Sequence, residues 1–426
     1  MESVRLNNFT ITLEKQFPKD IIKASFPLRY GKHSVIRTPE YEFLFNLNGE
    51  IKFIRGLNLK SWPHLTEQLK RTGGNDWVFY SVGDDSSDKG VINWMGEYYL
   101  PCLPYPSNSV WEISYFSNPN AMNALAALSQ LYANLFGVCK DGLSPALRGF
   151  IDLVVDNDEG VLHEKSKKLF SIIGGRVSVL PPDTRHVDYE VIPLMIADGC
   201  LYNCKFCCVK TGRQFKARLK SDIMEQIKQL KDFYGRNLEN YNALFLGNHD
   251  ALAAGEELIS MAAAESFAAF GFDHSASRVP KLFIFGSVDS LLKSGSGLFE
   301  KLNSLPFYTY INIGLESVDA PTLSYIHKPV DTSKVRDAFQ KMLDINSAYA
   351  NIEITANFLL GEPLSTDHYQ SLAKLLRDVP ADSRSKGVIY LSPLMESPKK
   401  RELLPKFLEI KKQSRLPVYI YLIQRL

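Results

Sequence analysis

Four cysteines are the residues of this sequence with the clearest capacity for chemistry. Cys200, Cys204, Cys207 and Cys208 lie within nine residues of one another, in a chain that holds six cysteines in all. Three thiolates on one short loop can hold three corners of an iron–sulfur cube. A structural zinc site is the alternative, with Cys208 or a nearby histidine as its fourth ligand. Because zinc sites usually draw a second ligand pair from further along the chain, and no cysteine follows Cys208, the pattern favours an iron–sulfur centre.

The spacing of these cysteines resembles the signature of the radical S-adenosylmethionine (radical SAM) enzymes. That signature is Cys-x3-Cys-x-aromatic-Cys on a loop after a strand, and Phe206 is the aromatic residue here. The resemblance implies that Cys200, Cys204 and Cys207 bind three irons of a [4Fe-4S] cluster. The fourth iron then stays open for the amino and carboxylate groups of S-adenosylmethionine (SAM). Cys208 is extra to the signature, and we expect it to pack behind the loop.

The resemblance also implies cofactor contacts at the C-terminal ends of parallel strands, which is where barrel enzymes form their sites. After the second strand the family carries a Gly-Gly-Glu-like motif, whose place is taken here by Gly247-Asn248-His249-Asp250. Asn248 replaces the second glycine and His249 is inserted, so the motif departs from the family's pattern. We expect Asp250 to accept a hydrogen bond from the cofactor's ammonium, although a helix N-cap explains this residue equally well.

Polar residues after the third and fourth strands resemble further cofactor contacts. A stretch similar to the family's Gly-x-Glu-Ser ends in Glu316 and Ser317, which the resemblance places near the cofactor's ribose or carboxylate. Ser287 offers a hydroxyl after the third strand, and a helix cap explains it as well. Lys328 could pair with the methionine carboxylate, but we interpret it as a solvated surface lysine.

Two residues near the fifth and sixth strands complete the candidate set. The stretch from Asn357 to Pro363 resembles the family's glycine-containing run near adenine, and Leu391 precedes a Ser-Pro pair where adenine often bonds to the main chain. Such contacts are commonly made by the main chain, so the residue types say little about them. The cofactor-binding candidates are Phe206, Gly247, Asn248, Asp250, Ser287, Glu316, Ser317, Asn357 and Leu391.

Short apolar runs alternate with helical periodicity from Val191 onward. The expected strands are Val191–Ile196, Ala243–Leu246, Leu282–Phe285, Tyr308–Ile313, Ile352–Leu360 and Val388–Leu391. Apolar strands that alternate with helices predict parallel βαβ units with helices covering the sheet. Six such units predict an α/β fold with a partial (β/α)6 parallel barrel. Val418–Leu422 could add a seventh strand.

Residues 1–185 lack this alternation of apolar runs with helical periodicity. Their pattern predicts an α+β N-terminal domain. Phe9–Leu13 and Tyr41–Leu47 alternate like half-buried strands, and Asn48-Gly49 indicates a hairpin before the next strand. A helix is expected from Pro119 to a stop at Gly137. Its predicted buried face holds Met122, Leu125, Leu128, Leu131 and Leu135.

A proline pair, Pro181-Pro182, marks the expected boundary between two domains. The division predicts an N-terminal domain at 1–185, whose role the sequence does not assign. The radical SAM partial-barrel domain is then expected at 186–426.

Composition and charge limit the classes of partner. Hydrophobic residues make up 45% of the chain and charged residues 23%, as in soluble globular proteins. A net charge of +2 gives no electrostatic case for nucleic acid or an anionic membrane. The N-terminus lacks an apolar signal region and no apolar run is long enough to span a bilayer, so we expect a cytoplasmic protein. Cys102 and Cys139 stand alone, and we expect both to be small buried apolar residues.

Two classes of function remain open. The resemblance implies an enzyme that takes an electron from flavodoxin or ferredoxin and cleaves SAM to methionine and a 5′-deoxyadenosyl radical. The radical would abstract hydrogen from a small-molecule or peptide substrate. The alternative is a non-catalytic iron–sulfur or zinc-binding interaction protein that keeps a degenerate barrel. No cobalamin-binding Asp-x-His-x-x-Gly pattern occurs in the first region, and no cysteines remain after Cys208 for a second cluster.

Overall fold

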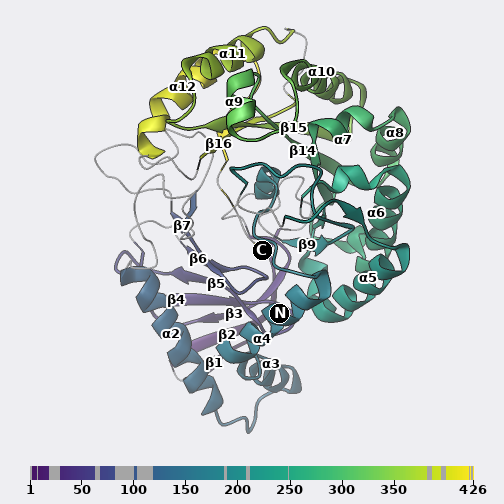
Figure 1. Ribbon diagram of the computed structural model, residues 1–426. Coiled ribbons are helices and arrows are strands. Elements are labelled where there is room, and N and C mark those ends of the chain that lie inside the picture. Colours follow the sequence, from purple (N-terminus) through teal and green to yellow (C-terminus); the bar gives the residue numbers. More distant parts are fainter. Residues whose placement is uncertain are drawn as a thin grey trace.

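Two β-sheets, each with helices packed on it, make up the computed structural model of the chain (Figure 1). The structure describes residues 2–6, 8–18, 29–62, 68–81, 100–102, 119–186, 190–207, 212–247, 249–380, 386–394, 400–421, 423 and 426. The first sheet is antiparallel and the second is parallel. One cluster of buried apolar side chains includes residues of both sheets, so the two parts of the molecule share a core.

The first sheet has eight strands in chain order. They are β1 (Ser3–Leu6), β2 (Phe9–Gln16), β3 (Lys32–Arg37), β4 (Tyr41–Phe45), β5 (Ile51–Gly56), β6 (Gln68–Arg71), β7 (Trp77–Ser81) and β8 (Leu100–Cys102). The predicted hairpin at Asn48-Gly49 is confirmed, because β4 and β5 pair directly across that turn. Gly49 adopts a φ of +78° there, a conformation that glycine reaches without steric cost.

Three helices pack on this sheet: α2 (Pro119–Phe136), α3 (Pro145–Val155) and α4 (Glu159–Ile173). The predicted helix from Pro119 is confirmed as α2, and Leu128, Leu131 and Leu135 are buried as expected. The expectation for Met122 is wrong, since it is exposed while the small residues Ala121 and Ala124 face the core. Small side chains at these two positions allow close packing of the helix on the sheet.

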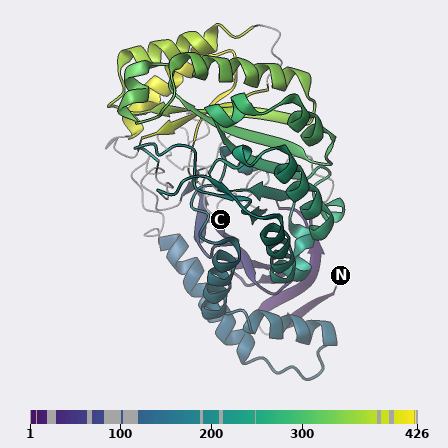
Figure 2. The same ribbon diagram turned by 45° about the vertical axis from the view of Figure 1, so that its right-hand side comes forward.

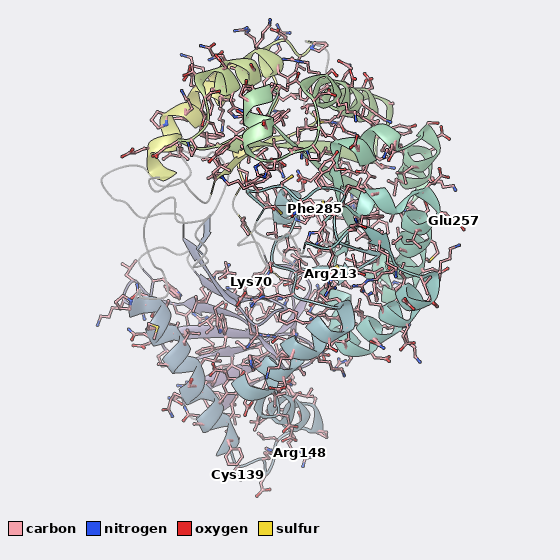
Figure 3. The ribbon with its side chains drawn as sticks, in the orientation of Figure 1. Lys70, Cys139, Arg148, Arg213, Glu257 and Phe285 are labelled. Atoms are coloured by element: carbon pink, nitrogen blue, oxygen red, sulfur yellow. The ribbon has the colours of Figure 1, made fainter. Side chains whose placement is uncertain are left out.

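The expectation of burial for the two isolated cysteines can be compared with the structure for Cys139 only. Cys139 is exposed in the turn after α2, at the end of the molecule remote from Phe285 of the barrel (Figure 3). The expectation that it is buried is therefore wrong. The side chain of Cys102 lies outside the described part of the structure.

The second sheet has seven parallel strands in the order β17-β16-β15-β14-β13-β12-β9. They are β9 (Val191–Leu194), β12 (Ala243–Leu246), β13 (Lys281–Ser287), β14 (Tyr308–Glu316), β15 (Ile352–Leu360), β16 (Ile389–Pro393) and β17 (Val418–Ile420). The predicted parallel barrel is confirmed, with β17 as the seventh strand. All four residues of β12 are buried, which explains why its sequence is apolar at every position instead of alternating.

The helices that follow these strands lie on the outer side of the parallel sheet (Figure 2). They are α5 (Lys220–Tyr234), α6 (Glu256–Phe270), α7 (Val288–Lys293), α8 (Ser296–Ser304), α9 (Ala320–Tyr325), α10 (Thr332–Ala348), α11 (Thr366–Arg377) and α12 (Leu404–Gln413). Several begin at a side-chain cap, as α10 does where Asp331 accepts from the backbone N–H of Lys334 at 2.8 Å. Within the described residues, no helix combines the length and the apolar character needed to cross a membrane.

The segment that joins the two sheets enters the barrel. Leu180, Asp183 and Thr184 are fully buried, and the short 3-10 helix η3 (Pro182–His186) lies among them. The Tyr421 hydroxyl donates to the Leu180 carbonyl at 2.5 Å, so the end of the chain and the joining segment hold each other in place. Pro181-Pro182 is thus part of a packed region, and the division of the chain at residue 185 stays a prediction.

A buried ion-pair group connects the first sheet to the start of the barrel. Glu190, directly before β9, accepts from Lys52 of β5 at 2.9 Å and from Lys70 of β6 at 3.2 Å. The side chains of all three are at most 7% exposed. Burial opposes ionisation of Glu190, but the two lysines outweigh it and hold the pKa of its carboxyl at about 2. Glu190 is therefore ionised and forms buried ion pairs with the two lysines between the sheets (Lys70 is labelled in Figure 3).

Candidate functional site

A cavity of about 200 Å³ opens at the C-terminal ends of the barrel strands. Its lining includes Cys200, Cys204 and Cys207 from the loop after β9, together with residues of β13, β14, β15 and β16. The position agrees with the general rule that parallel barrels form sites at this end. The three cysteines, which the sequence groups only by spacing, thus face one common space.

The loop that carries the cysteines is closed at its base by a two-stranded strap. Strand β10 (Ala197–Asp198) pairs with β11 (Lys216–Ala217), and a further bridge joins Cys200 to Gln214. Gly199 has a φ of +72°, and a Cβ at this position would lie 2.3 Å from the Gln214 carbonyl oxygen. Only glycine fits this crossing, because any side chain would strain the backbone and collide with the opposite strand.

Burial governs the protonation of the cysteines. Cys204 is buried, and burial raises the pKa of its thiol to about 11, with Lys328 acting in the opposite direction. Burial also raises the pKa of Cys200. A buried thiol of this kind loses its proton readily only when a cation binds the sulfur. Phe206 lines the same cavity and packs against the core.

Asp250 is a buried acid at the cavity wall. Its Oδ1 accepts from the backbone N–H of Ser287 at 3.1 Å and from the Ser290 hydroxyl at 2.7 Å. Its Oδ2 is buried, and no donor in the structure as described reaches it. The carboxylate makes no capping hydrogen bond to the 3-10 helix η5 (Ala251–Ala254) that follows, so the alternative interpretation as an N-cap is not supported. Burial raises the pKa of Asp250.

Glu316 and Lys328 form a second charged element of the cavity. Their side chains are 8% and 4% exposed, and Lys328 Nζ lies 3.8 Å from Glu316 Oε1. The interpretation of Lys328 as a surface lysine is therefore wrong: the turn after α9 directs it inward, where it also lies 5.0 Å from the centre of the Tyr202 ring. Glu316 has a φ of +69° at a bulge between β14 and β15, a strained conformation typical of functional sites.

The other candidates divide into those at the cavity and those away from it. Ser287 and Asn357 line the cavity, and Ser287 also caps α7 through a reciprocal bond with Ser290. Ser317 and Leu391 do not belong to the lining. Ser317 bonds to His368 Nδ1 at 2.8 Å, and Leu391 lies in the apolar core because the strand alternation turns it away from the cavity.

Gly247 begins the Gly247–Asp250 motif at a tight turn. It lies just before the cavity-lining residues and adopts a φ of +89°. A Cβ at this position would lie 2.5 Å from the Ala251 Cβ. Its role in the structure is thus to make a turn that no larger residue could make. Asn248 lies outside the described residues, as does Cys208.

Sequence reasoning missed several lining residues. Asn312 and Tyr202 face the cavity, and Tyr202 accepts a bond from the Asp289 N–H at 3.0 Å. Asn312 could have been found by counting back along β14 in steps of two from Gly314, since alternate strand residues share a face. Val179 and Tyr421 also line the cavity, and no local signal in the sequence indicates that these distant segments meet.

The donor set at the cavity has a clear chemical character. Three thiols, a buried lysine and a buried carboxylate line one cavity, and one oxygen of this carboxylate has no partner among the described residues. Thiols suit a soft metal or an iron–sulfur cluster. A carboxylate and an ammonium that line the same cavity suit a ligand that carries both charges, as an amino acid does. The residues present therefore fit a thiol-bound cluster beside a zwitterionic group.

Comparison with known proteins identifies one family. Residues 194–376 match the model described as the Radical SAM superfamily, and these residues include the three cysteines and the candidates up to Asn357. No curated protein matches the chain.

Several solved structures are similar to the chain at low identity. The cobalamin-dependent S-adenosylmethionine radical enzyme OxsB is 14% identical, with a TM-score of 0.35, and the match covers 55% of this chain and 33% of OxsB. A radical SAM methyltransferase from Sphaerobacter thermophilus is 12% identical, with a TM-score of 0.38, 54% of this chain covered and 65% of that one. Streptococcus suis SuiB bound to its precursor peptide SuiA is 10% identical, with a TM-score of 0.37. That match covers 72% of this chain and 61% of SuiB. The chain thus spans less than two thirds of the length of each.

Proposed function

This chain is a member of the radical SAM enzyme superfamily through its domain at residues 194–376, and from that membership we propose its reaction. The protein cleaves S-adenosylmethionine reductively at a [4Fe-4S] cluster, and the resulting 5′-deoxyadenosyl radical abstracts hydrogen from a substrate. The observation that carries this proposal is the convergence of three loop thiols and two sets of buried charges on one cavity.

Cys200, Cys204 and Cys207 would hold the cluster. Three protein ligands leave one iron free, which suits a cluster that binds a cofactor directly. When bound, the cluster supplies the electron that breaks the sulfur–carbon bond of SAM. The strap formed by β10 and β11 positions the loop, and the apolar wall of the cavity keeps water away from the reacting atoms.

The buried charges would hold the methionine end of the cofactor. Asp250 Oδ2 has no partner in the described structure and would accept a hydrogen bond from the ammonium. Lys328 would pair with the carboxylate, and Glu316 with the ribose hydroxyls or with the ammonium. Charge-assisted bonds of this type are about twice as strong as neutral ones, so they would fix the cofactor's orientation.

The electron donor, substrate and compartment follow as parts of the proposal. Flavodoxin or ferredoxin would supply the electron, and the substrate would be a small molecule or a peptide. Thiols that bind iron must stay reduced, which supports a reducing compartment such as the cytoplasm. Residues 1–185 would then cover one side of the barrel domain, since Glu190 ties their sheet to its first strand.

Anaerobic reconstitution tests the proposed reaction. Reconstituted protein given SAM and dithionite should form 5′-deoxyadenosine, measured by liquid chromatography and mass spectrometry. Cys204→Ala should abolish the product and lower the iron bound per chain. Cys139→Ala is the matched control, because this exposed cysteine lies outside the site, and it should change neither quantity. Cluster-loaded wild-type protein that forms no 5′-deoxyadenosine would contradict the proposal and favour the non-catalytic alternative.

A further inference from the structure

Glu316, the strained residue of the cavity, lies at the centre of a very tight turn. Its φ is +69°, and the backbone N–H of Ser317 donates to the carbonyl of Leu315 at 2.9 Å across it. A hydrogen bond between residues i and i+2 around a positive φ is the mark of the rare, strained form of γ-turn. Such a conformation persists only where the surrounding structure holds it, so the contacts of Ser317 become important.

Ser317 is held by a histidine of α11. Both side chains are fully buried, and Ser317 Oγ lies 2.8 Å from His368 Nδ1. His368 Nε2 lies 3.1 Å from the carbonyl oxygen of Leu359, which can only accept, so Nε2 carries a proton. Burial lowers the pKa of His368 and keeps the ring neutral. Nδ1 is therefore an acceptor, and the Ser317 hydroxyl donates to it.

The same hydroxyl connects the turn to the second charged residue of the cavity. The backbone N–H of Asp319 donates to Ser317 Oγ at 3.0 Å. Asp319 Oδ2 in turn caps α9, because it accepts from the backbone N–H of Thr322 at 3.0 Å. Lys328 lies in the turn after α9, with its Nζ 3.8 Å from Glu316 Oε1. Ser317 thus joins the turn that carries the glutamate to the helix that places the lysine.

The Glu316 carboxylate has little freedom of position. A Cβ at Gly314 would lie 2.4 Å from Glu316 Oε1, so the carboxylate lies over a backbone position where only glycine leaves room. Gly314, Glu316 and Lys328 line the cavity, whereas Ser317 and His368 do not belong to the lining. His368 is therefore placed to act on a ligand only through its neighbours.

We infer that His368 is a positioning residue for Glu316. Its Nδ1 lone pair holds the Ser317 hydroxyl, and thereby the strained turn that presents the Glu316 carboxylate to the cavity. The inference rests on the proposed function, in which Glu316 binds the ribose hydroxyls or the ammonium of SAM. Without an acceptor at Nδ1, the buried hydroxyl would be left unpaired, which is costly, and the turn would relax to another conformation.

Two substitutions of His368 separate the roles of its ring nitrogens. A carboxamide oxygen near the position of Nδ1 would still accept from Ser317 in His368→Asn. The longer side chain in His368→Gln would reach the position of Nε2, donate to Leu359 and lose the acceptor. We expect His368→Gln to raise the Kd for SAM at least about tenfold and His368→Asn to raise it less than about threefold. Calorimetry on anaerobically reconstituted protein without reductant measures both values, since SAM is then not cleaved.

A double-mutant cycle shows whether the effect passes through Glu316. Glu316→Gln alone should raise the Kd for SAM at least about tenfold, because it removes the carboxylate. In that background, His368→Gln should change the Kd further by less than about twofold. Ser317→Ala should resemble His368→Gln and provides the test if the latter does not fold.

Asn346→Ala is the matched control for the loss of a buried helix-to-strand contact. Asn346 of α10 is buried and bonds to the main chain of Ile354 on β15, through Nδ2 at 2.8 Å and Oδ1 at 2.6 Å. It does not belong to the cavity lining. Its loss should lower the urea midpoint of unfolding and leave the Kd for SAM unchanged.

The outcomes distinguish the inference from the proposed function. Equal Kd values for His368→Asn and His368→Gln would overturn the inference, and so would additive effects of His368→Gln and Glu316→Gln. Either result would leave the proposed function standing, with His368 as a packing residue. Wild-type protein that does not bind SAM would overturn the proposed function and the inference with it. We expect weaker binding only where the acceptor, the Ser317 hydroxyl or the Glu316 carboxylate is missing.

Discussion

Asp250 shows at the scale of one residue how burial prepares a site for a charged ligand. Two donors hold its Oδ1, and its other oxygen is buried without a partner among the described residues. Leaving such an oxygen unpaired is unfavourable in the free protein, because its desolvation is not compensated by a hydrogen bond. A bound ammonium would supply that hydrogen bond. Lys328 is the complementary residue, since a buried cation nearby suits the carboxylate of the same ligand.

Replacement of Asp250 should therefore weaken cofactor binding. We expect Asp250→Asn to raise the Kd for SAM about tenfold to a hundredfold, because the variant loses a charge-assisted bond. Burial raises the pKa of Asp250, so wild-type affinity should fall as the pH drops through this raised pKa and the carboxylate takes up a proton. Calorimetry across pH would measure both effects. Asp289→Asn is the control, and equal affinities of Asp250→Asn and wild type would contradict the assignment.

At the scale of elements, the strap under the cysteine loop depends on Gly199. We expect Gly199→Ala to lower the iron bound per chain and the stability of the apo protein, because the new Cβ would lie 2.3 Å from the Gln214 carbonyl oxygen. Gly142→Ala is the matched control: it has a similar φ of +75° with no atom within 4 Å of the new Cβ. That variant should cost roughly 1 kcal/mol of strain and keep its iron. Equal iron contents in the two variants would contradict a specific role of the strap.

The barrel strands and the cysteine loop could be predicted from the sequence, whereas several contacts of the cavity could not. The strands of the barrel were predictable, because burial on both faces makes runs such as Ala243–Leu246 apolar throughout. The cysteine loop was predictable from spacing that chemistry requires. Lys328 was misinterpreted because a lysine is usually solvated, and only the turn after α9 shows that it is buried. Asp183 and Tyr421 could not be predicted, since contacts between distant segments leave no local periodicity.

At the scale of the whole molecule, a few buried charges join the two sheets in addition to the shared apolar core. Glu190 before β9 pairs with Lys52 and Lys70 of the first sheet, all three with side chains at most 7% exposed. A buried ion pair adds little net stability compared with apolar residues, but removal of one partner leaves the other charges uncompensated. Beside the shared apolar core, the first sheet is thus joined to the barrel by a group that does not tolerate the loss of a single member.

Glu190→Gln should accordingly destabilise the protein by about 3–5 kcal/mol, measured by urea unfolding near neutral pH. The effect depends on pH, because the pKa of Glu190 is about 2 in the folded protein, below its usual 4.5. A carboxyl with a lowered folded pKa contributes stability that is complete above its unfolded pKa and is lost as the pH falls toward the folded one. The difference between wild type and Glu190→Gln should therefore be constant above about pH 5.5 and shrink between pH 4.5 and 2.

Glu239→Gln provides the comparison for this prediction. Glu239 pairs with Lys32 at 2.8 Å and also joins the two parts of the chain, but both side chains are about one third exposed. Solvent screens such a pair, so its loss should cost less than about 1 kcal/mol. If Glu190→Gln were no more destabilising than Glu239→Gln, the buried group would not be what holds the first sheet to the barrel. The shared apolar core would then account for the connection alone.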